Sequence, residues 1–145
     1  MADIADLEPL IGRWTQVIDA PRHLDDRVKG EMSMEWLQDE KVILQRSRAE
    51  NPMFPEDVVL IMAAGQDAEG DFTASYVDSR AVSRTLHMSF RDGVWTWWRH
   101  AADADDFDQR FEGRLSQDGR TIDSSCYLVE DGEWIHDFDV TYTRV

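Results

Sequence analysis

Residues 82–100 read VSRTLHMSFRDGVWTWWRH, in which two alternating runs flank one Asp-Gly pair. In the first run, apolar side chains stand mostly at every second position from Val82 to Phe90, and the residues between them are polar. This period of two is typical of a strand with one buried and one solvated face. Asp92 and Gly93 tolerate the positive φ angles of a tight turn, so the two runs are predicted to form an antiparallel hairpin.

The same turn signal recurs at Asp118-Gly119 and Asp131-Gly132, and no proline follows Pro55. Between such breaks the sequence is a succession of short runs, which is the pattern of an antiparallel meander. We therefore predict about ten strands. Their expected ranges are residues 11–19, 27–37, 41–49, 57–64, 71–78, 81–91, 94–100, 107–115, 120–129 and 133–144.

Helix signals are scarce. Residues 2–11, ADIADLEPLI, predict one short N-terminal turn, with Asp3 or Asp6 as its cap and Pro9 limiting its length. Ten strands with almost no helix to cover a sheet are most simply accommodated by closure, because closure removes the exposed edges. The expected fold is all-β, a roughly ten-stranded antiparallel up-and-down barrel that occupies residues 1–145 as a single domain.

Composition excludes several classes of partner. The 145 residues include 30 acidic and 15 basic ones, and the net charge of -15 repels phosphate backbones and anionic lipids. The chain lacks a basic segment followed by an apolar stretch at its start, and it has no apolar run of the roughly 18 residues that a membrane span needs. Cys126 is the single cysteine, so no disulfide framework is expected. We expect a cytoplasmic protein that binds neither nucleic acid nor membranes.

The two ends of the chain carry a resemblance to a known group of barrels. Residues 10–16, LIGRWTQ, place Gly12-x-Trp14 at the start of the first strand, and the chain ends in W-x-x-D-F-D-V-T-Y-T-R-V. With about ten strands between, this layout resembles the calycin barrels. These include lipocalins, fatty-acid-binding proteins, nitrobindin-like haem barrels and small bacterial lipocalin-like domains. The resemblance implies that Trp14 plugs the closed end and that Arg144 lies over its ring, a cation–π contact worth roughly 0.5–2 kcal/mol.

The densest aromatic stretch is residues 93–100, GVWTWWRH. Alternation puts Trp95 and Trp97 on one face with Arg99, and Trp98 on the other face with His100. At least one indole therefore lines the interior, where large rings with a single N–H donor suit a ligand cavity. A tryptophan on the outer face leaves a homodimer contact as an open alternative.

Charged residues on strand-like runs suggest how such a cavity would hold a polar group. A buried guanidinium must be paired or satisfied by a ligand, and Arg46, Arg84 and Arg110 all lie on apolar runs. Fatty-acid-binding barrels hold an anionic head group with an Arg-Tyr pair, so the resemblance implies a small apolar or amphipathic ligand with an acidic or carbonyl end. The expected ligand-binding residues are Trp36, Arg46, Tyr76, Asp78, Trp97, Arg110, His136 and Tyr142.

Two other functions stay open. Asp78, Tyr76 or His136 could serve as acid or base in a cavity enzyme such as an isomerase, cyclase or hydro-lyase. Nitrobindin-like proteins imply haem with His136 as its ligand, although Gln16 and Ile18 replace the glycines of that family's first strand. Apart from that haem no cofactor is expected. The histidines show no HxH, HxxxH or HExxH spacing, so no metal site is predicted either.

Alternation identifies which residues share a face but not which face points inward. Trp134, His136, Phe138, Val140 and Tyr142 share one face of the last predicted strand. They form a cavity wall if that face is internal and a surface strip if it is not. A continuous internal cavity of about 300 Å³ or more would fit ligand binding, and a packed interior would not.

Overall fold

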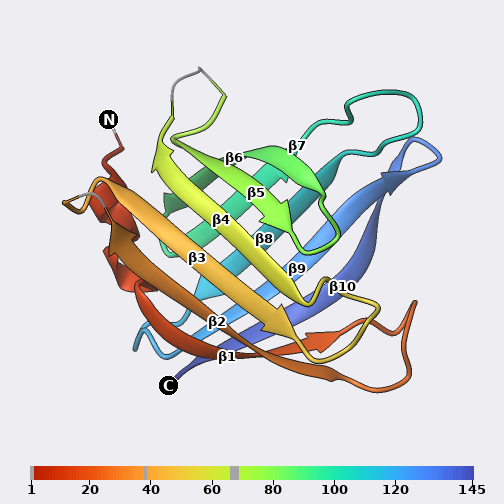
Figure 1. Ribbon diagram of the computed structural model, residues 1–145, viewed down its shortest axis with the longest axis horizontal. Coiled ribbons are helices and arrows are strands. Elements are labelled where there is room, and N and C mark those ends of the chain that lie inside the picture. The colour runs from red at the N-terminus through yellow and green to blue at the C-terminus, as the bar shows by residue number, and fades with distance from the viewer. Residues whose placement is uncertain (1, 38, 66–68) are drawn as a thin grey trace.

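The chain folds into a closed barrel of ten antiparallel strands, which confirms the predicted fold class (Figure 1). This computed structural model describes residues 2–37, 39–65 and 69–145. Each strand pairs with its neighbours in the sequence, and β1 and β10 pair to close the barrel. The strands are β1 Gly12–Asp19, β2 Val28–Leu37, β3 Val42–Ala49, β4 Asp57–Ala64, β5 Phe72–Asp78, β6 Ser83–Arg91, β7 Val94–Arg99, β8 Gln109–Leu115, β9 Thr121–Glu130 and β10 Glu133–Arg144.

The Asp-Gly pairs make the tight turns that the sequence predicted. Asp92 and Gly93 have φ angles of 54° and 76°, and Asp131 and Gly132 have φ angles of 51° and 78°. Both residues of each turn are therefore in the left-handed region, as a type I′ hairpin requires. At the third predicted pair only Gly119, with a φ of 72°, is in the left-handed region. All ten observed strands begin and end within two residues of the predicted ranges.

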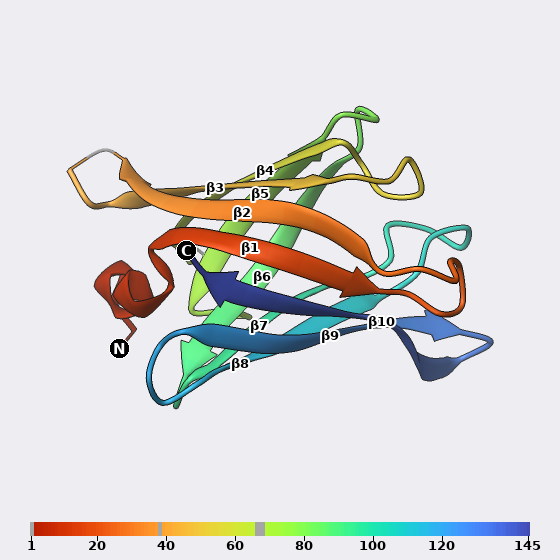
Figure 2. The ribbon, with the colours of Figure 1, turned by 90° about the horizontal axis from the view of Figure 1, so that it is seen from below.

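A short 3₁₀-helix, η1 Ile4–Leu10, lies at one end of the barrel, and the β1–β2 and β3–β4 loops lie at the other (Figure 2). The Asp3 side chain caps the helix by accepting a hydrogen bond from the Ala5 amide at 2.9 Å. The only helical turn in the described ranges is too short to cross a membrane.

The helix end of the barrel is closed by Trp14, which is 1% exposed. As predicted, the guanidinium of Arg144 lies over the indole, 4.1 Å from its centroid. Arg144 also donates hydrogen bonds to the carbonyls of Ile11 at 2.7 Å, Pro9 at 2.6 Å and Gly119 at 3.0 Å. Gly12 allows this close approach, since a Cβ atom there would lie 2.6 Å from Arg144 Nη1.

One detail of β10 differs from the prediction. Its pairing with β9 shifts between His136 and Phe138, so that Asp137 is the extra residue of a β-bulge. The bulge reverses the alternation, because Asp137 and Phe138 both line the interior while His136 lies exposed on the outer wall. The prediction that His136 shares a face with Phe138, Val140 and Tyr142 was therefore wrong.

Candidate functional site

The interior of the barrel is divided along its axis into a packed part and a hollow part. The packed part lies at the helix end, where eight large apolar side chains besides Trp14 and Trp95 are less than 2% exposed. These side chains are Leu7, Leu10, Met34, Ile43, Met62, Phe72, Met88 and Ile122. Close packing at this end provides the hydrophobic core of the fold. Side chains at the other end therefore do not need to fill the interior.

The hollow part is a cavity of about 530 Å³ at the opposite, loop end of the barrel. It exceeds the threshold of about 300 Å³ set for ligand binding and lies within the range of ligand pockets. Loop residues surround its mouth: His23 from the β1–β2 loop, Phe54 from β3–β4, Arg80 from β5–β6 and Phe107 from β7–β8.

Aromatic rings form one wall of the cavity. Phe111 of β8 packs edge-on against Trp95 with ring centroids 4.9 Å apart, and it stacks on Trp97 at 5.4 Å with an angle of 4°. Tyr142 of β10 lies next to Trp95 at 6.4 Å. Such rings hold one another rigidly and offer a flat apolar surface to a ligand.

Two buried polar atoms in the cavity wall have no hydrogen-bond partner among the described residues. They are the acceptor Oε1 of Gln45 and the donor Nε1 of Trp95, in side chains that are 5% and 1% exposed. A buried polar atom without a partner costs roughly 1–3 kcal/mol, so native proteins usually satisfy it. The hydroxyl of Tyr142 likewise bonds to no described residue, and burial raises its pKa, which keeps it protonated at neutral pH.

Three arginines line the cavity, and two of them are neutralised by the protein itself. Arg99 makes a two-pronged ion pair with Asp106 at 2.8 and 3.2 Å, and Arg80 contacts Asp78 at 2.8 Å. Arg84 differs, because its guanidinium bonds only to the carbonyl of Ser83 and meets no carboxylate among the described residues. Arg84 is therefore the cavity arginine that no described carboxylate pairs, while the lining carboxylate of Asp137 contacts Arg22 and His23.

The Tyr76 hydroxyl donates a hydrogen bond to Asp78 at 2.7 Å, behind the cavity wall. Burial alone would raise the pKa of Asp78, but hydrogen bonds from Arg80, Tyr76 and two backbone amides outweigh it and lower the pKa to about 2. Burial, followed by the Asp78 hydrogen bond, raises the pKa of Tyr76. Both groups therefore titrate far from neutral pH, where a general acid or base needs its pKa.

The structure brings together only part of the predicted ligand-binding set. Tyr76, Trp97 and Tyr142 line the cavity, and Asp78 supports Tyr76 from behind. The other four residues do not line it. Trp36 donates to Glu8 at 2.6 Å, Arg46 is exposed, Arg110 lies over the rings of Tyr127 and Trp134, and His136 bonds to Asp139 at 2.7 Å.

Three cavity residues with strong polar signals, Gln45, Arg84 and Trp95, were not among the expected ligand-binding residues, although Arg84 and Trp95 had been noted on strand-like runs. Arg84 shares a face with Leu86, and Trp95 shares one with Trp97, so alternation had grouped them correctly. Gln45 lies two residues after Ile43, on the same face of β3. A search for polar residues on an otherwise apolar face would have found it. The missing fact was which face of β3 points inward.

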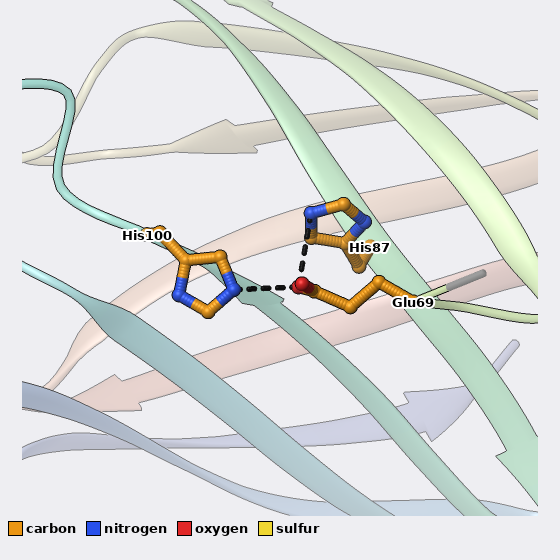
Figure 3. A group of neighbouring side chains, drawn as sticks. All are labelled: Glu69, His87 and His100. Carbon is orange, nitrogen blue, oxygen red and sulfur yellow. Dashed lines mark hydrogen bonds and ion pairs between the residues drawn. The ribbon is translucent and has the colours of Figure 1, made fainter. Parts of the chain in front are cut away.

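A second group of polar side chains lies on the outer wall and is drawn in Figure 3. It consists of Glu69 in the β4–β5 loop, His87 in β6 and His100 just after β7, and we call it the Glu69 cluster. Oε2 of Glu69 lies 2.6 Å from Nε2 of His100 and 3.1 Å from Nε2 of His87. The indole of Trp98 donates to the same oxygen at 2.8 Å. None of these residues lines the cavity.

No protein-family model matches this chain, and no curated protein is significantly similar to its sequence. The function must therefore be argued from the geometry and chemistry of the cavity itself.

Proposed function

We propose that this protein is a lipocalin-like barrel that binds a small amphipathic acid in the cavity at its loop end. The observation that carries the proposal is the combination of a cavity of about 530 Å³ with buried polar atoms that have no partner in the part of the chain that the structure describes. A purely structural interior would have filled the space or paired those atoms.

The lining specifies the ligand's chemistry. The stacked rings of Trp97 and Phe111 suit an apolar body, whether planar or aliphatic. The charge of Arg84, which no described carboxylate pairs, favours a carboxylate, because a charge-assisted hydrogen bond to a guanidinium is stronger than a neutral one. Gln45 Oε1 accepts from a donor and Trp95 Nε1 donates to an acceptor, so polar groups on the ligand satisfy atoms that no described residue pairs. The ligand class is an apolar acid that carries a second hydrogen-bonding group.

Binding without chemistry is favoured over a cavity enzyme. The acid–base candidates Asp78 and Tyr76 bond to each other, and their pKa values lie on either side of the neutral range. His136, the third candidate and the haem ligand that the family resemblance implied, lies on the outer wall. The positions and contacts of Asp78, Tyr76 and His136 therefore support neither a cavity enzyme nor a haem protein.

A fluorescent fatty acid with a dansyl group tests the proposal by titration into the purified protein. We expect saturable binding that weakens about tenfold, or about 1.4 kcal/mol, in Arg84→Met. Arg46→Met is the matched control, because it removes an arginine from the outer wall of the same barrel and should leave the affinity unchanged. A neutral naphthylamine probe should bind wild type and Arg84→Met equally, since it has no charge for Arg84 to pair.

A second variant separates cavity binding from surface binding. Ser47 lines the cavity from β3, and Ser47→Trp would fill part of the volume while far-UV circular dichroism checks that the barrel remains folded. Both probes should lose saturable binding. If Ser47→Trp binds the dansyl probe as well as wild type, or if wild type binds neither probe, the cavity is not a ligand site.

A further inference from the structure

The Glu69 cluster joins three residues that are distant in sequence but meet on the outer wall. His87 lies on β6 and is 18% exposed at its side chain, and it pairs in register with Trp98 of the neighbouring β7. His100 follows β7 and Glu69 precedes β5, so three chain segments each contribute one side chain. Both imidazole rings direct a nitrogen at the same carboxylate oxygen (Figure 3).

The spacing of the three ligand atoms is close to that of a metal centre. One ring nitrogen of each histidine and a carboxylate oxygen of Glu69 all lie within 4.8 Å of one another. A tetrahedral zinc ion with ligands about 2.0–2.1 Å away separates those ligands by roughly 3.3 Å. The side chains of His100 and Glu69 are 60% and 41% exposed. Small rotations of these two side chains can therefore bring the three ligand atoms to that separation while His87 keeps its place on β6.

The donor set identifies the class of ion. Two imidazoles and one carboxylate suit zinc, copper, nickel or cobalt, whereas magnesium and calcium prefer sites made of oxygen atoms alone. The Trp98 indole donates a hydrogen bond to Glu69 at 2.8 Å, as the outer partners of metal-binding carboxylates do. The net charge of -15 raises the concentration of cations near the whole surface.

The remaining histidines lack such an arrangement. His23 contacts Asp137 at 2.8 Å and His136 contacts Asp139 at 2.7 Å, each a pair with one carboxylate. Across residues 2–37, 39–65 and 69–145, the Glu69 cluster is the one group in which three histidine or carboxylate ligands converge.

We propose that Glu69, His87 and His100 bind one first-row transition-metal dication of the zinc class, through Nε2 of each histidine and the Glu69 carboxylate, with water completing the coordination. This site is separate from the cavity and does not depend on the proposed ligand binding. The hydrogen bonds seen in Figure 3 then give way to metal bonds from neutral imidazoles.

Calorimetric titration of Zn²⁺ into tag-free, chelator-treated protein tests this proposal at neutral pH. We expect one ion per chain and an affinity that a large excess of Mg²⁺ does not reduce. His100→Gln and Glu69→Gln should each weaken binding by more than about a hundredfold. Trp98→Phe should weaken it about tenfold, because it removes only the outer hydrogen bond. Co²⁺ should give the visible absorption of a low-symmetry nitrogen–oxygen site in wild type and lose it in His100→Gln.

His136→Gln is the matched control, since it removes a histidine–carboxylate pair on the same outer surface and should leave the affinity unchanged. Thermal unfolding of each variant checks that the barrel is intact. The proposal is overturned if wild type binds no Zn²⁺ in the micromolar range, if Mg²⁺ competes with it, or if His100→Gln binds as tightly as wild type.

Discussion

Replacing Arg144 by methionine tests how the helix end of the barrel is held closed. The guanidinium lies 4.1 Å from the ring centroid of Trp14 and donates to three carbonyls, from the 3₁₀-helix, its C-cap residue Ile11 and the β8–β9 turn. Methionine keeps most of the side-chain length and removes all four polar contacts. The variant therefore measures the contribution of the charged group rather than that of packing.

The contacts allow the loss to be worked out. The bonds to Ile11 and Gly119 are partly buried and come from a charged donor, so each contributes about 1.5 kcal/mol. The bond to Pro9 is exposed and adds little, and the contact with Trp14 adds about 1 kcal/mol. We expect the free energy of unfolding to fall by about 4 kcal/mol, which for a chain of this size lowers Tm by roughly 8–16 °C.

Urea unfolding followed by far-UV circular dichroism measures this change. Arg13→Met is the control, because Arg13 is exposed next to the same end and its side chain bonds to no described residue. That variant should stay within about 0.5 kcal/mol of wild type. Arg144→Lys should be intermediate, since an ammonium cannot reach three carbonyls at once. A loss below about 1 kcal/mol in Arg144→Met would refute the reasoning.

Three further predictions concern acid stability and two glycines with positive φ angles. The pKa of Asp78 is about 2 in the folded protein, below the value of about 3.9 in an unfolded chain, so its stabilisation is present above about pH 4 and is lost as the pH falls toward 2. Wild type should lose about 2 kcal/mol more than Asp78→Asn over this window in urea titrations, and parallel curves would contradict the assignment. Gly132→Ala should cost about 1 kcal/mol, because its φ of 78° is strained for alanine and no atom lies near its Cβ position. Gly12→Ala should cost about 2–3 kcal/mol in the same assay, since its methyl group also strikes Arg144, and equal losses would argue against a steric role.

The strand order and the closed barrel could be predicted from the sequence because hairpin pairing is local. Asp92-Gly93 and Asp131-Gly132 set both the place and the twist of their turns. The contact between Trp14 and Arg144 was also expected, on the resemblance of the two chain ends to the calycin barrels, and the β1–β10 pairing places these residues opposite each other.

The candidate site could be predicted only in part. Trp97 and Tyr142 were assigned to the cavity correctly, but Arg46 and Arg110 were chosen over Arg84. All three arginines stand on apolar runs, and their sequence neighbourhoods do not distinguish them. The side chain of Arg46 points outward because Ile43 and Gln45 point inward from β3. The packing of the rest of the barrel decides which face of β3 is internal.

The sequence by itself determined the number of strands, their turns and the residues that share each face, since these depend on contacts between neighbours in the chain. The tertiary structure decided which face points inward, how far the core fills the barrel, and where distant side chains converge. A single extra residue at Asp137 moved His136 to the outer wall, and three chain segments brought Glu69 to His87 and His100. Such outcomes depend on register and volume across the whole closed sheet, which no local pattern of residues specifies.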